Sequence, residues 1–302
     1  MSIDLSKLLT ERRNANSANI DTLSTEEMLT VINNEDQQVA HAITPYIPQI
    51  AQLVDSVANA FRHGGRLIYI GAGTSGRLGI LDASECPPTF GTRPEQVVGL
   101  IAGGHTAILK AVENVEDNAA QGAEDLRTLG FNEHDVLVGI AASGRTPYVL
   151  GAMEYAHQQN ALVAIVSCNP HGEMAQRADI AITPVVGPEV VTGSTRLKAG
   201  TAQKLGLNMI TTGSMIRSGK VYSNLMVDVE ATNAKLIERQ ISIVMEATEC
   251  DRQTAQTALD ASGRHCKTAI VMVLANLSAD DAKKLLADNN GFIRKALQHA
   301  SH

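Results

Sequence analysis

Five short apolar runs, each followed by a loop rich in Gly or Ser, constrain the fold of this chain more than any other feature. They cover residues 66–70, 97–101, 135–141, 161–167 and 179–186. Segments with helical periodicity separate these runs. Nearly continuous apolar strands that alternate with helices are typical of a parallel sheet covered on both faces. We therefore predict an α/β fold, with a doubly wound, three-layer αβα architecture around a mostly parallel central sheet.

Helical segments are expected on both sides of this sheet. In the first 63 residues Ser24 and Glu27 form a capping-box pattern, and an apolar periodic stretch covers residues 47–61. After the last apolar run, helices are expected over 198–218 and 223–247, then in shorter segments with Asp251 and Ser278 as N-caps. The predicted division is an N-terminal helical segment over 1–54, a sheet domain over 55–220 and a C-terminal helical region over 221–302.

Charge and composition exclude several classes of partner. The chain has 25 Lys and Arg against 32 Asp and Glu, a formal net charge of −7, 3% aromatic residues and no Trp. This is the wrong sign of charge for a binder of phosphate backbones, and base-stacking platforms are absent, so we expect no nucleic-acid partner. No apolar run approaches the roughly 18 residues of a membrane span. Charged residues interrupt the first 14 residues where a signal peptide would need an apolar core, so a cytoplasmic location is expected.

The four cysteines indicate neither a metal site nor a disulfide framework. Cys86, Cys168, Cys250 and Cys266 lie far apart and form no C-x-x-C pair. Such spacing gives little support for a zinc site or a redox dithiol. We expect reduced and mostly buried thiols.

Two loops repeat the triplet Ser-Gly-Arg after a predicted strand, 68 residues apart. The first loop is Gly71–Arg77 and matches G-x-G-x-x-G, and the second covers Ala142–Pro147. The dinucleotide fingerprint also requires an acidic residue at the end of the second strand, but Ala102-Gly103-Gly104 follows that strand here. A nicotinamide-dependent oxidoreductase is therefore a weak alternative.

The composition of both loops favours binding of an anion or of sugar hydroxyls. A Ser/Thr-Gly loop between a strand and a helix offers backbone N–H groups, hydroxyl donors and a helix N-terminus, while Gly allows close approach of a ligand. A phosphorylated sugar fits two such loops better than a nucleotide does. The alternative is that both are ordinary turns whose Ser and Thr cap the following helices. The candidate binding residues are Gly73, Thr74, Ser75 and Gly76 in the first loop and Ser143, Gly144, Arg145 and Thr146 in the second.

Glu85 is a candidate general acid. It precedes Cys86-Pro87-Pro88, and Pro87 should end the helix at Cys86. A carboxyl group at the negative end of a helix dipole should have a raised pKa and could stay protonated. The alternative is a solvated glutamate in a turn.

A second acidic cluster, Glu113 to Asp117, contains a candidate general base. Glu113 and Glu116 are expected at positions i and i+3 on one helix face. A pair of glutamates without a metal suits proton abstraction by one and protonation of a leaving group by the other. The alternative is a solvated helix face.

Residues 187–204 combine hydroxyls, Glu189 and cations, including Lys204, at the start of a long predicted helix. Their polar side chains could complete a pocket. A helix cap with a solvated basic face would give the same pattern.

Three long motifs, at 65–91, 139–149 and 187–204, resemble signatures of the N-acetylmuramic acid 6-phosphate etherases. These are sugar isomerase (SIS) domain proteins, and the resemblance covers essentially the whole chain. It implies an SIS-type fold, a homodimer, and cleavage of the D-lactyl ether of N-acetylmuramic acid 6-phosphate without a metal or cofactor. It also implies that Glu85 donates a proton to the departing lactate, that Glu116 acts on the C2 proton, and that the two Ser-Gly loops hold the substrate.

Two other functions remain open at this point. An SIS aldose–ketose isomerase of phosphosugars would also use a carboxylate base at C2, although it needs no acid at a C3 ether oxygen. A non-catalytic regulator that binds a sugar phosphate, as the related glucokinase regulatory protein does, would carry two SIS modules in a longer chain. This chain of 302 residues has room for one.

Overall fold

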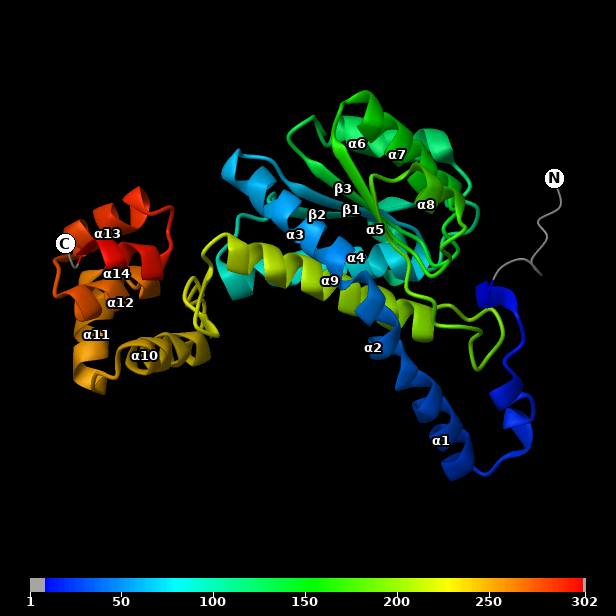
Figure 1. Cartoon of the computed structure of the whole chain (residues 1–302), viewed down its shortest axis with the longest axis horizontal. Helices are drawn as coiled ribbons and strands as arrows, with labels where there is room; N and C mark the ends of the chain where they lie inside the picture. Colours follow the sequence, from blue (N-terminus) through cyan, green and yellow to red (C-terminus); the bar gives the residue numbers. More distant parts are fainter. Residues whose placement is uncertain (1–8, 301–302) are drawn as a thin grey trace. The chain divides into compact units, whose positions relative to one another are not determined.

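The computed structural model describes residues 9–300 and divides them into two compact units. Unit 1 contains the residues up to Ser84 together with Glu95–Thr211, and unit 2 contains Glu85–Pro94 and the residues from Thr212 onward. Each unit has a hydrophobic core of its own. Figure 1 shows the elements of both units.

The central sheet of unit 1 confirms the five predicted strands. It consists of β1 (Leu67–Gly71), β2 (Val97–Ile101), β3 (Val136–Ile140), β4 (Leu162–Val166) and β5 (Ile180–Ile182). All pairs are parallel, and the spatial order is β2-β1-β3-β4-β5. Each predicted run overlaps its strand, although β5 is much shorter than residues 179–186. The two strands beside each other in the middle, β1 and β3, are buried at every position because helices cover both of their faces.

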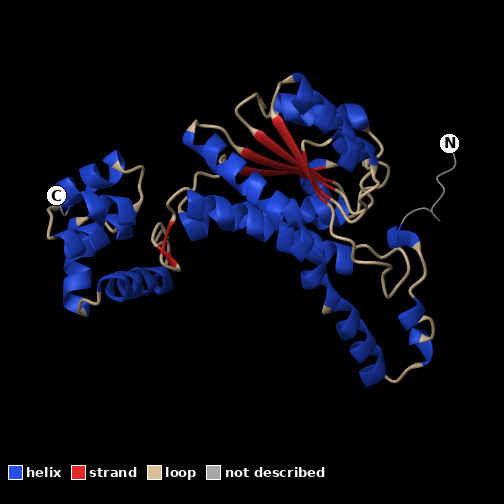
Figure 2. Cartoon of the chain, in the orientation of Figure 1, coloured by secondary structure: helices blue, strands red, loops and turns tan. Residues whose placement is uncertain are grey.

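Helices form a layer on each face of the sheet, which confirms the predicted three-layer αβα architecture. On one face, side chains of α6 (Ala119–Thr128), α7 (Pro147–Gln158) and α8 (Glu173–Arg177) pack with strand residues such as Ile70 and Leu137. On the other face, α4 (Gly73–Phe90) approaches Tyr69 so closely that a Cβ on Gly79 would lie 2.9 Å from the Tyr69 Cβ, and the Tyr69 hydroxyl reaches the Leu207 carbonyl of α9 (Lys198–Arg217). Figure 2 shows the red sheet between blue helices.

The N-terminal part of unit 1 is helical, as expected. Ser24 and Glu27 form the predicted capping box at the start of α1, and the predicted stretch 47–61 is α3. The Ser17 hydroxyl and the Asn14 amide donate to the carbonyls of Val190 and Pro188, so this segment holds the loop that precedes α9. The elements are η2 (Leu9–Glu11), η3 (Ala15–Ser17), η4 (Ile20–Thr22), α1 (Thr25–Asp36), α2 (Gln38–Ile43), η5 (Thr44–Tyr46) and α3 (Ile47–Arg62), with α5 (Gly104–Leu109) later in the unit.

Unit 2 is mainly helical, but the predicted helix over 223–247 is wrong in its first part. A hairpin of β6 (Val221–Tyr222) and β7 (Leu225–Met226) occupies this part, and Ser223 in its two-residue turn has a φ of 55°. The helix starts only after Asn233, whose side chain caps it. Asp251 and Ser278 cap helices as predicted. The helices are α10 (Ala234–Thr248), α11 (Arg252–Ala261), α12 (Cys266–Ala275), α13 (Ala279–Asp288) and α14 (Ile293–Ala300).

The predicted end of a helix at Cys86 is also wrong, because α4 continues through Pro87 and Pro88 to Phe90. The side chains of Cys86 and Phe90 are buried, and their packing holds the last turn despite the two missing proline donors. Gly91, with a φ of 58°, stops the helix, and its N–H donates to the Pro87 carbonyl.

All four cysteines are free thiols, as predicted, and Cys86, Cys168 and Cys266 are buried. Burial raises the pKa of the Cys168 and Cys266 thiols to about 12. Across residues 9–300 no helix combines the length and the apolar character that crossing a bilayer requires.

Candidate functional site

The two Ser-Gly loops lie side by side because they follow the neighbouring strands β1 and β3. Gly71 at the end of β1 is paired with Ile140 at the end of β3. In the strand order β2-β1-β3-β4-β5, the chain passes from β1 to β2 on one side and then crosses to β3 on the other side of β1. The topological switch point therefore lies between β1 and β3. Ligands of open parallel sheets bind outside the carboxyl ends of the strands at this point. The fold therefore places both predicted loops where a ligand is expected.

Glycines bring the start of α4 into close contact with β1. A Cβ on Gly71 would lie 2.8 Å from the Gly76 backbone nitrogen, and a Cβ on Gly76 would lie 2.6 Å from a side-chain carbon of Ile101. Gly73 begins the helix with a φ of 52°, in the left-handed region that favours glycine. The loop is therefore fixed by the absence of side chains at these positions.

Ser75 and Gln203 join the first loop to α9. The buried Ser75 hydroxyl donates to Gln203 Oε1 at 3.0 Å. Gln203 is 1% exposed, and its Nε2 has no hydrogen-bond acceptor in residues 9–300. A buried donor without an acceptor is costly in a folded protein. An oxygen-bearing ligand at this loop would supply the missing acceptor.

The second loop is held from behind by its backbone. Gly144 has a φ of 69°, and a Cβ there would lie 3.3 Å from Gly172 Cα. The Asn169 amide donates to the Ser143 carbonyl at 3.2 Å, and the Met174 N–H donates to the Gly144 carbonyl. These contacts fix the loop without using its side-chain polar groups.

Several polar side chains of the two loops stay available for a ligand. Within the described part of the chain, the hydroxyls of Thr74, Ser143 and Thr146 and the Arg145 guanidinium form no hydrogen bond or ion pair. Thr146 is the N-cap of α7, but its side chain makes no capping bond. For Thr146, the alternative that the loop hydroxyls cap the following helices is therefore wrong.

A cavity of about 360 Å³ connects the first loop with the acidic cluster. Its lining includes Gly73, Arg77, Glu113 and Glu116. The expectation that the two glutamates share a helix face is wrong: residues 110–118 form turns, and Asn114 has a φ of 61°. Both glutamates are exposed. The turn, rather than a helix, directs both of them to the cavity.

The main chain of Glu116 is attached to the start of α7. The Tyr148 N–H donates to the Glu116 carbonyl at 2.9 Å. Tyr148 directly follows Thr146 and Pro147, so this bond places Glu116 beside the second loop. On the other side, the Arg77 guanidinium donates to the carbonyl of Ile108 and fixes the chain that enters the turn. The structure thus brings Glu116 together with both loops.

Glu85 is not among the residues that line this cavity. It lies inside α4, twelve residues after Gly73, with an exposed side chain. Its expected place at a helix end is wrong, since five more residues of α4 follow it. A helix rises about 1.5 Å per residue, so more than three turns of α4 separate Glu85 from the loop at its start.

Glu189 and Lys204 both form hydrogen bonds with residues of α9. Glu189 is fully buried, and its two carboxylate oxygens accept from the backbone N–H groups of Lys198 and Ala199, each at 2.9 Å. It therefore caps α9. Lys204 is exposed on α9, and with the Asn208 amide oriented to satisfy its neighbours, Lys204 Nζ donates to Asn208 at 3.0 Å.

The sequence analysis missed Gln203 and Arg77 as parts of the site. Gln203 lies in the polar segment 187–204, next to Lys204, but the residue order does not reveal that it is buried against Ser75. Arg77 belongs to the repeated Ser-Gly-Arg triplet, and only the structure shows that it lines the same cavity as Glu113 and Glu116. Within residues 9–300, no three or more His, Cys, Asp or Glu side chains are grouped so that they could hold a metal ion.

Comparisons with known proteins give a matching domain model, relatives that match along the whole chain and a solved structure of the same fold. Residues 49–157 match the model of the glucokinase regulatory protein N-terminal SIS domain. The N-acetylmuramic acid 6-phosphate etherase of Klebsiella aerogenes is 85% identical, over 99% of this chain and 100% of that protein. The protein of the same name from Photobacterium profundum is 70% identical, over 98% of this chain and 99% of its own. A solved Bacteroides fragilis structure, described as a putative phosphosugar isomerase involved in capsule formation, has a TM-score of 0.50 and 19% identity. It covers 65% of this chain and 94% of its own, and shows the same fold.

Proposed function

The chain belongs to the N-acetylmuramic acid 6-phosphate etherase family, and from this membership we propose how the site in unit 1 works. The activity is that of a carbon-oxygen lyase: it cleaves the D-lactyl ether of N-acetylmuramic acid 6-phosphate and gives N-acetylglucosamine 6-phosphate and D-lactate. This is a step in the recycling of cell-wall amino sugars.

One observation supports the location of the site above all others. The cavity that contains Glu116 is also lined by Gly73, just after the carboxyl end of β1, and the hydroxyls of Thr74, Ser143 and Thr146 in the two loops have no partner in the described chain. The proposed base, the proposed substrate loops and a cavity are thus all parts of unit 1, which supports this location. The cavity volume of about 360 Å³ is within the range of small-molecule sites.

The chemistry that fits this site is an elimination followed by a hydration. Once the sugar ring opens, the C1 aldehyde acidifies the proton on C2. Removal of that proton gives an enolate-like state, and the C3–O bond then breaks as lactate leaves with a proton. Water adds to C3 while a proton returns to C2. One water is consumed overall, and no electrons are exchanged with a cofactor, so we expect neither a metal nor a nucleotide.

We assign the C2 proton to Glu116 and the proton of the departing lactate to Glu85. Glu116 lines the cavity and lies beside both loops, which supports its role as the base. The assignment of Glu85 rests on the family motif at residues 84–88. Glu113 shares the cavity with Glu116 and is the alternative acid that the geometry offers.

We propose that the two loops hold the substrate through Gly73, Thr74, Ser75 and Gly76 and through Ser143, Gly144, Arg145 and Thr146. One loop would take the 6-phosphate and the other the sugar hydroxyls. Gln203 would add the N–H donor that is unpartnered here. For Glu189 the two bonds to α9 support a positioning role, and Lys204 would contribute its positive charge from the surface of α9.

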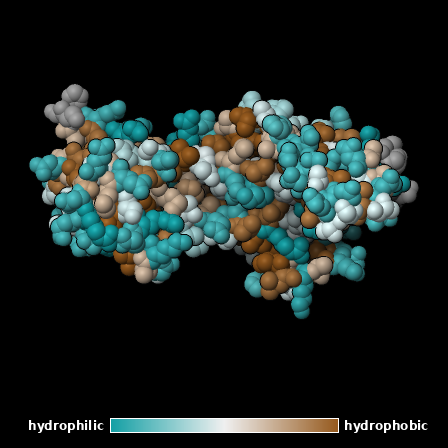
Figure 3. Space-filling view, turned by 90° about the horizontal axis from the view of Figure 1, so that it is seen from below, coloured by the Kyte–Doolittle hydropathy of each residue, from teal (hydrophilic) through white to brown (hydrophobic). Residues whose placement is uncertain are grey.

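We further propose a homodimer in the cytoplasm. Apolar side chains are exposed on both α4 and α9, at Leu81 and Met209, and Figure 3 shows brown apolar surface between the polar side chains. The four free cysteines fit a reducing compartment. Size-exclusion chromatography with light scattering tests the dimer, and cell fractionation tests the location.

Lactate release from N-acetylmuramic acid 6-phosphate tests the activity. The purified protein is incubated with this substrate in EDTA and deuterated water, and the sugar product is analysed by mass spectrometry. We expect lactate together with deuterium at C2, since the C2 proton exchanges with solvent during the reaction. Ketose formation from a hexosamine 6-phosphate without lactate would instead indicate an isomerase, and binding without turnover would indicate a regulator.

Three matched substitutions separate the carboxyl groups. Glu116→Gln should abolish both lactate release and C2 exchange, and Glu85→Gln should abolish lactate release while some C2 exchange remains. Each loss should be about 10²–10⁴-fold, the usual contribution of a positioned acid or base. Glu113→Gln, the control from the same cavity, should change both rates little. If Glu113→Gln rather than Glu85→Gln loses only lactate release, then Glu113 is the acid.

A further inference from the structure

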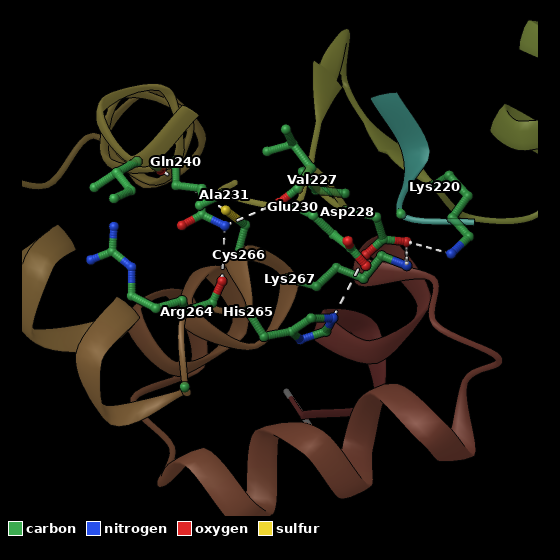
Figure 4. A pocket seen from close by; sticks show the side chains of 14 residues that line it. Lys220, Val227, Asp228, Glu230, Ala231, Gln240, Arg264, His265, Cys266 and Lys267 are labelled. Carbon is green, nitrogen blue, oxygen red and sulfur yellow. Dashed lines mark hydrogen bonds and ion pairs between the residues drawn. The ribbon is translucent and has the colours of Figure 1, made fainter. Parts of the chain in front are cut away.

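Unit 2 contains a cavity of its own, of about 610 Å³, which the proposed reaction does not use. It lies between the loop that precedes α10 and the start of α12, and Figure 4 shows its polar lining. Charged side chains enter it from these two elements, at Asp228, His265 and Lys267, and from the segment before β6, at Lys220. A cavity of this size and polarity can hold a small ligand.

Positively charged groups outnumber the carboxylate at the Asp228 end of this cavity. Asp228 is 8% exposed and accepts from Lys267 at 2.7 Å and from Lys220 at 3.1 Å. His265 Nε2 lies 3.7 Å from the same carboxylate. One carboxylate therefore faces two lysines and an imidazole. The neighbouring Glu230 is exposed, so water screens its charge, and Arg264 at the other end of the cavity is a further cation that is paired with Asp260.

Lys267 retains donors without acceptors. The residue is only 6% exposed, and its ammonium group has three N–H donors. Throughout residues 9–300, Asp228 is the one acceptor that it reaches. Burial lowers the pKa of Lys267, while Asp228 acts in the opposite direction. A buried ammonium group with free donors is unfavourable unless a further acceptor is bound.

A buried acceptor in the same cavity also lacks a partner. Gln240 is 2% exposed, and its Nε2 donates to the carbonyls of Val229 and Arg264, each at 3.0 Å. These two bonds fix the amide, so that Oε1 must be the free end, and Oε1 has no donor in the described chain. In Figure 4 the Gln240 amide lies on the left side of the cavity lining, towards Arg264.

From these observations we propose that the cavity of unit 2 is a binding site for a small hydroxylated anion. Its carboxylate or phosphate group accepts from Lys267, and it neutralises the surplus charge around Asp228. Its hydroxyl group donates to Gln240 Oε1. Helix α12 starts at Cys266, and its first N–H groups point out of the helix. The partial positive charge at this helix end is favourable for an anion. Hydroxycarboxylates and sugar phosphates both combine these groups.

The His265 imidazole offers a local readout of binding. Burial is the main cause that lowers the pKa of His265, and Lys267, Lys220 and Lys283 add to this effect while Asp228 opposes it. An anion beside the imidazolium would stabilise the protonated form. Binding in this cavity should therefore raise the pKa of His265, whereas binding in unit 1 should not.

The experiment is an NMR titration of the full chain with ¹³C-labelled histidine. The His265 Cε1–H signal is assigned with His265→Gln, and its pH titration is recorded with D-lactate, N-acetylglucosamine 6-phosphate, inorganic phosphate or chloride at equal ionic strength. We expect saturable upward shifts of the His265 pKa with at least one of the hydroxylated anions. Saturation with D-lactate alone identifies a hydroxycarboxylate site, and saturation with the sugar phosphate alone identifies a phosphosugar site. The signal of His63 in unit 1 reports general salt effects.

Two controls connect the shift to the cavity. Lys267→Gln should weaken binding about 10- to 100-fold, as expected when a hydrogen bond to a charged group is lost. Lys284→Gln removes an exposed charge from α13 of the same unit and should leave binding unchanged. For a lactate site, propionate lacks only the hydroxyl group and should bind more weakly. The proposal is overturned if none of the anions shifts His265 beyond the effect of chloride, a result that needs no variant, or if Lys267→Gln binds as well as the native chain.

Discussion

At the residue scale, the available contacts separate ligand-binding groups from structural ones. The sequence predicted Ser75 and Thr146 as binding residues for the same reason, a hydroxyl in a Ser-Gly loop that follows a strand. In the structure the Ser75 hydroxyl is engaged with Gln203, whereas that of Thr146 is free within the described residues. The sequence cannot show this difference, because it depends on a residue of α9 that is more than 120 positions away from Ser75.

Asp82 leads to a prediction about pH. Burial raises its pKa above the usual 3.8, although the Tyr69 and Thr211 hydroxyls donate to it at 2.9 and 3.2 Å and oppose the shift. The folded state therefore binds this proton more tightly than the unfolded state does. The stabilisation that results is present below pH 3.8 and is lost as the pH rises through the folded-state pKa.

We expect Asp82→Asn to reduce this loss of stability. The free energy of unfolding of the variant minus that of the native chain should increase from about pH 4 to pH 7. Urea unfolding followed by circular dichroism at several pH values measures this difference. Asp36→Asn, an exposed change on α1, is the control and should show no such trend. A difference for Asp82→Asn that does not vary with pH would contradict the argument.

At the element scale, the strands were predictable and the irregular segments were not. The strands β1, β3 and β4 are buried on both faces, so their apolar runs match the observed bounds to within one residue. The turn at 110–118 and the β6–β7 hairpin depend on left-handed backbone at Asn114 and Ser223. Periodicity carries no signal for such positions. The end of α4 was misplaced because burial of Cys86 and Phe90 outweighs the local effect of Pro87.

The start of α9 depends on a buried carboxylate, and this gives a stability prediction. Glu189→Ala would leave the N–H groups of Lys198 and Ala199 without acceptors in the interior. We expect a loss of about 2–4 kcal/mol in the free energy of unfolding, since each buried unsatisfied group costs roughly 1–3 kcal/mol. Ser24→Ala removes an exposed cap of α1 in the same unit and should cost only about 1 kcal/mol. Equal losses in urea unfolding would show that burial of the cap does not matter.

At the scale of the whole molecule, fold class and family could be predicted from the sequence, but the limits of the two units could not. The unit boundary crosses α4 after Ser84 and α9 after Thr211, inside continuous helices. Local sequence signals mark the ends of helices, so a boundary within a helix leaves no such mark. The cavity in unit 2 was missed for a related reason: Lys220, Asp228 and Lys267 lie on three different segments.

Protection against hydrogen exchange should differ strongly along the chain. The amides of β3 are paired with a strand on each side and fully buried, so they should exchange most slowly. Those of the β6–β7 hairpin, with two residues in each strand and partial exposure, should exchange much faster. Mass spectrometry of peptic peptides after labelling compares the two regions. Similar protection in both would mean that the hairpin is covered by contacts other than those described.

The hydrogen bond from the Tyr148 N–H to the Glu116 carbonyl fixes the position of the proposed base independently of its side chain. Main-chain atoms hold position 116, so replacing its side chain leaves that anchor intact. The scaffold would accept a histidine or a cysteine there and would still direct it to the same cavity between the same loops. Position 116 is therefore a place where protein engineers could substitute other reactive side chains that act on a sugar phosphate.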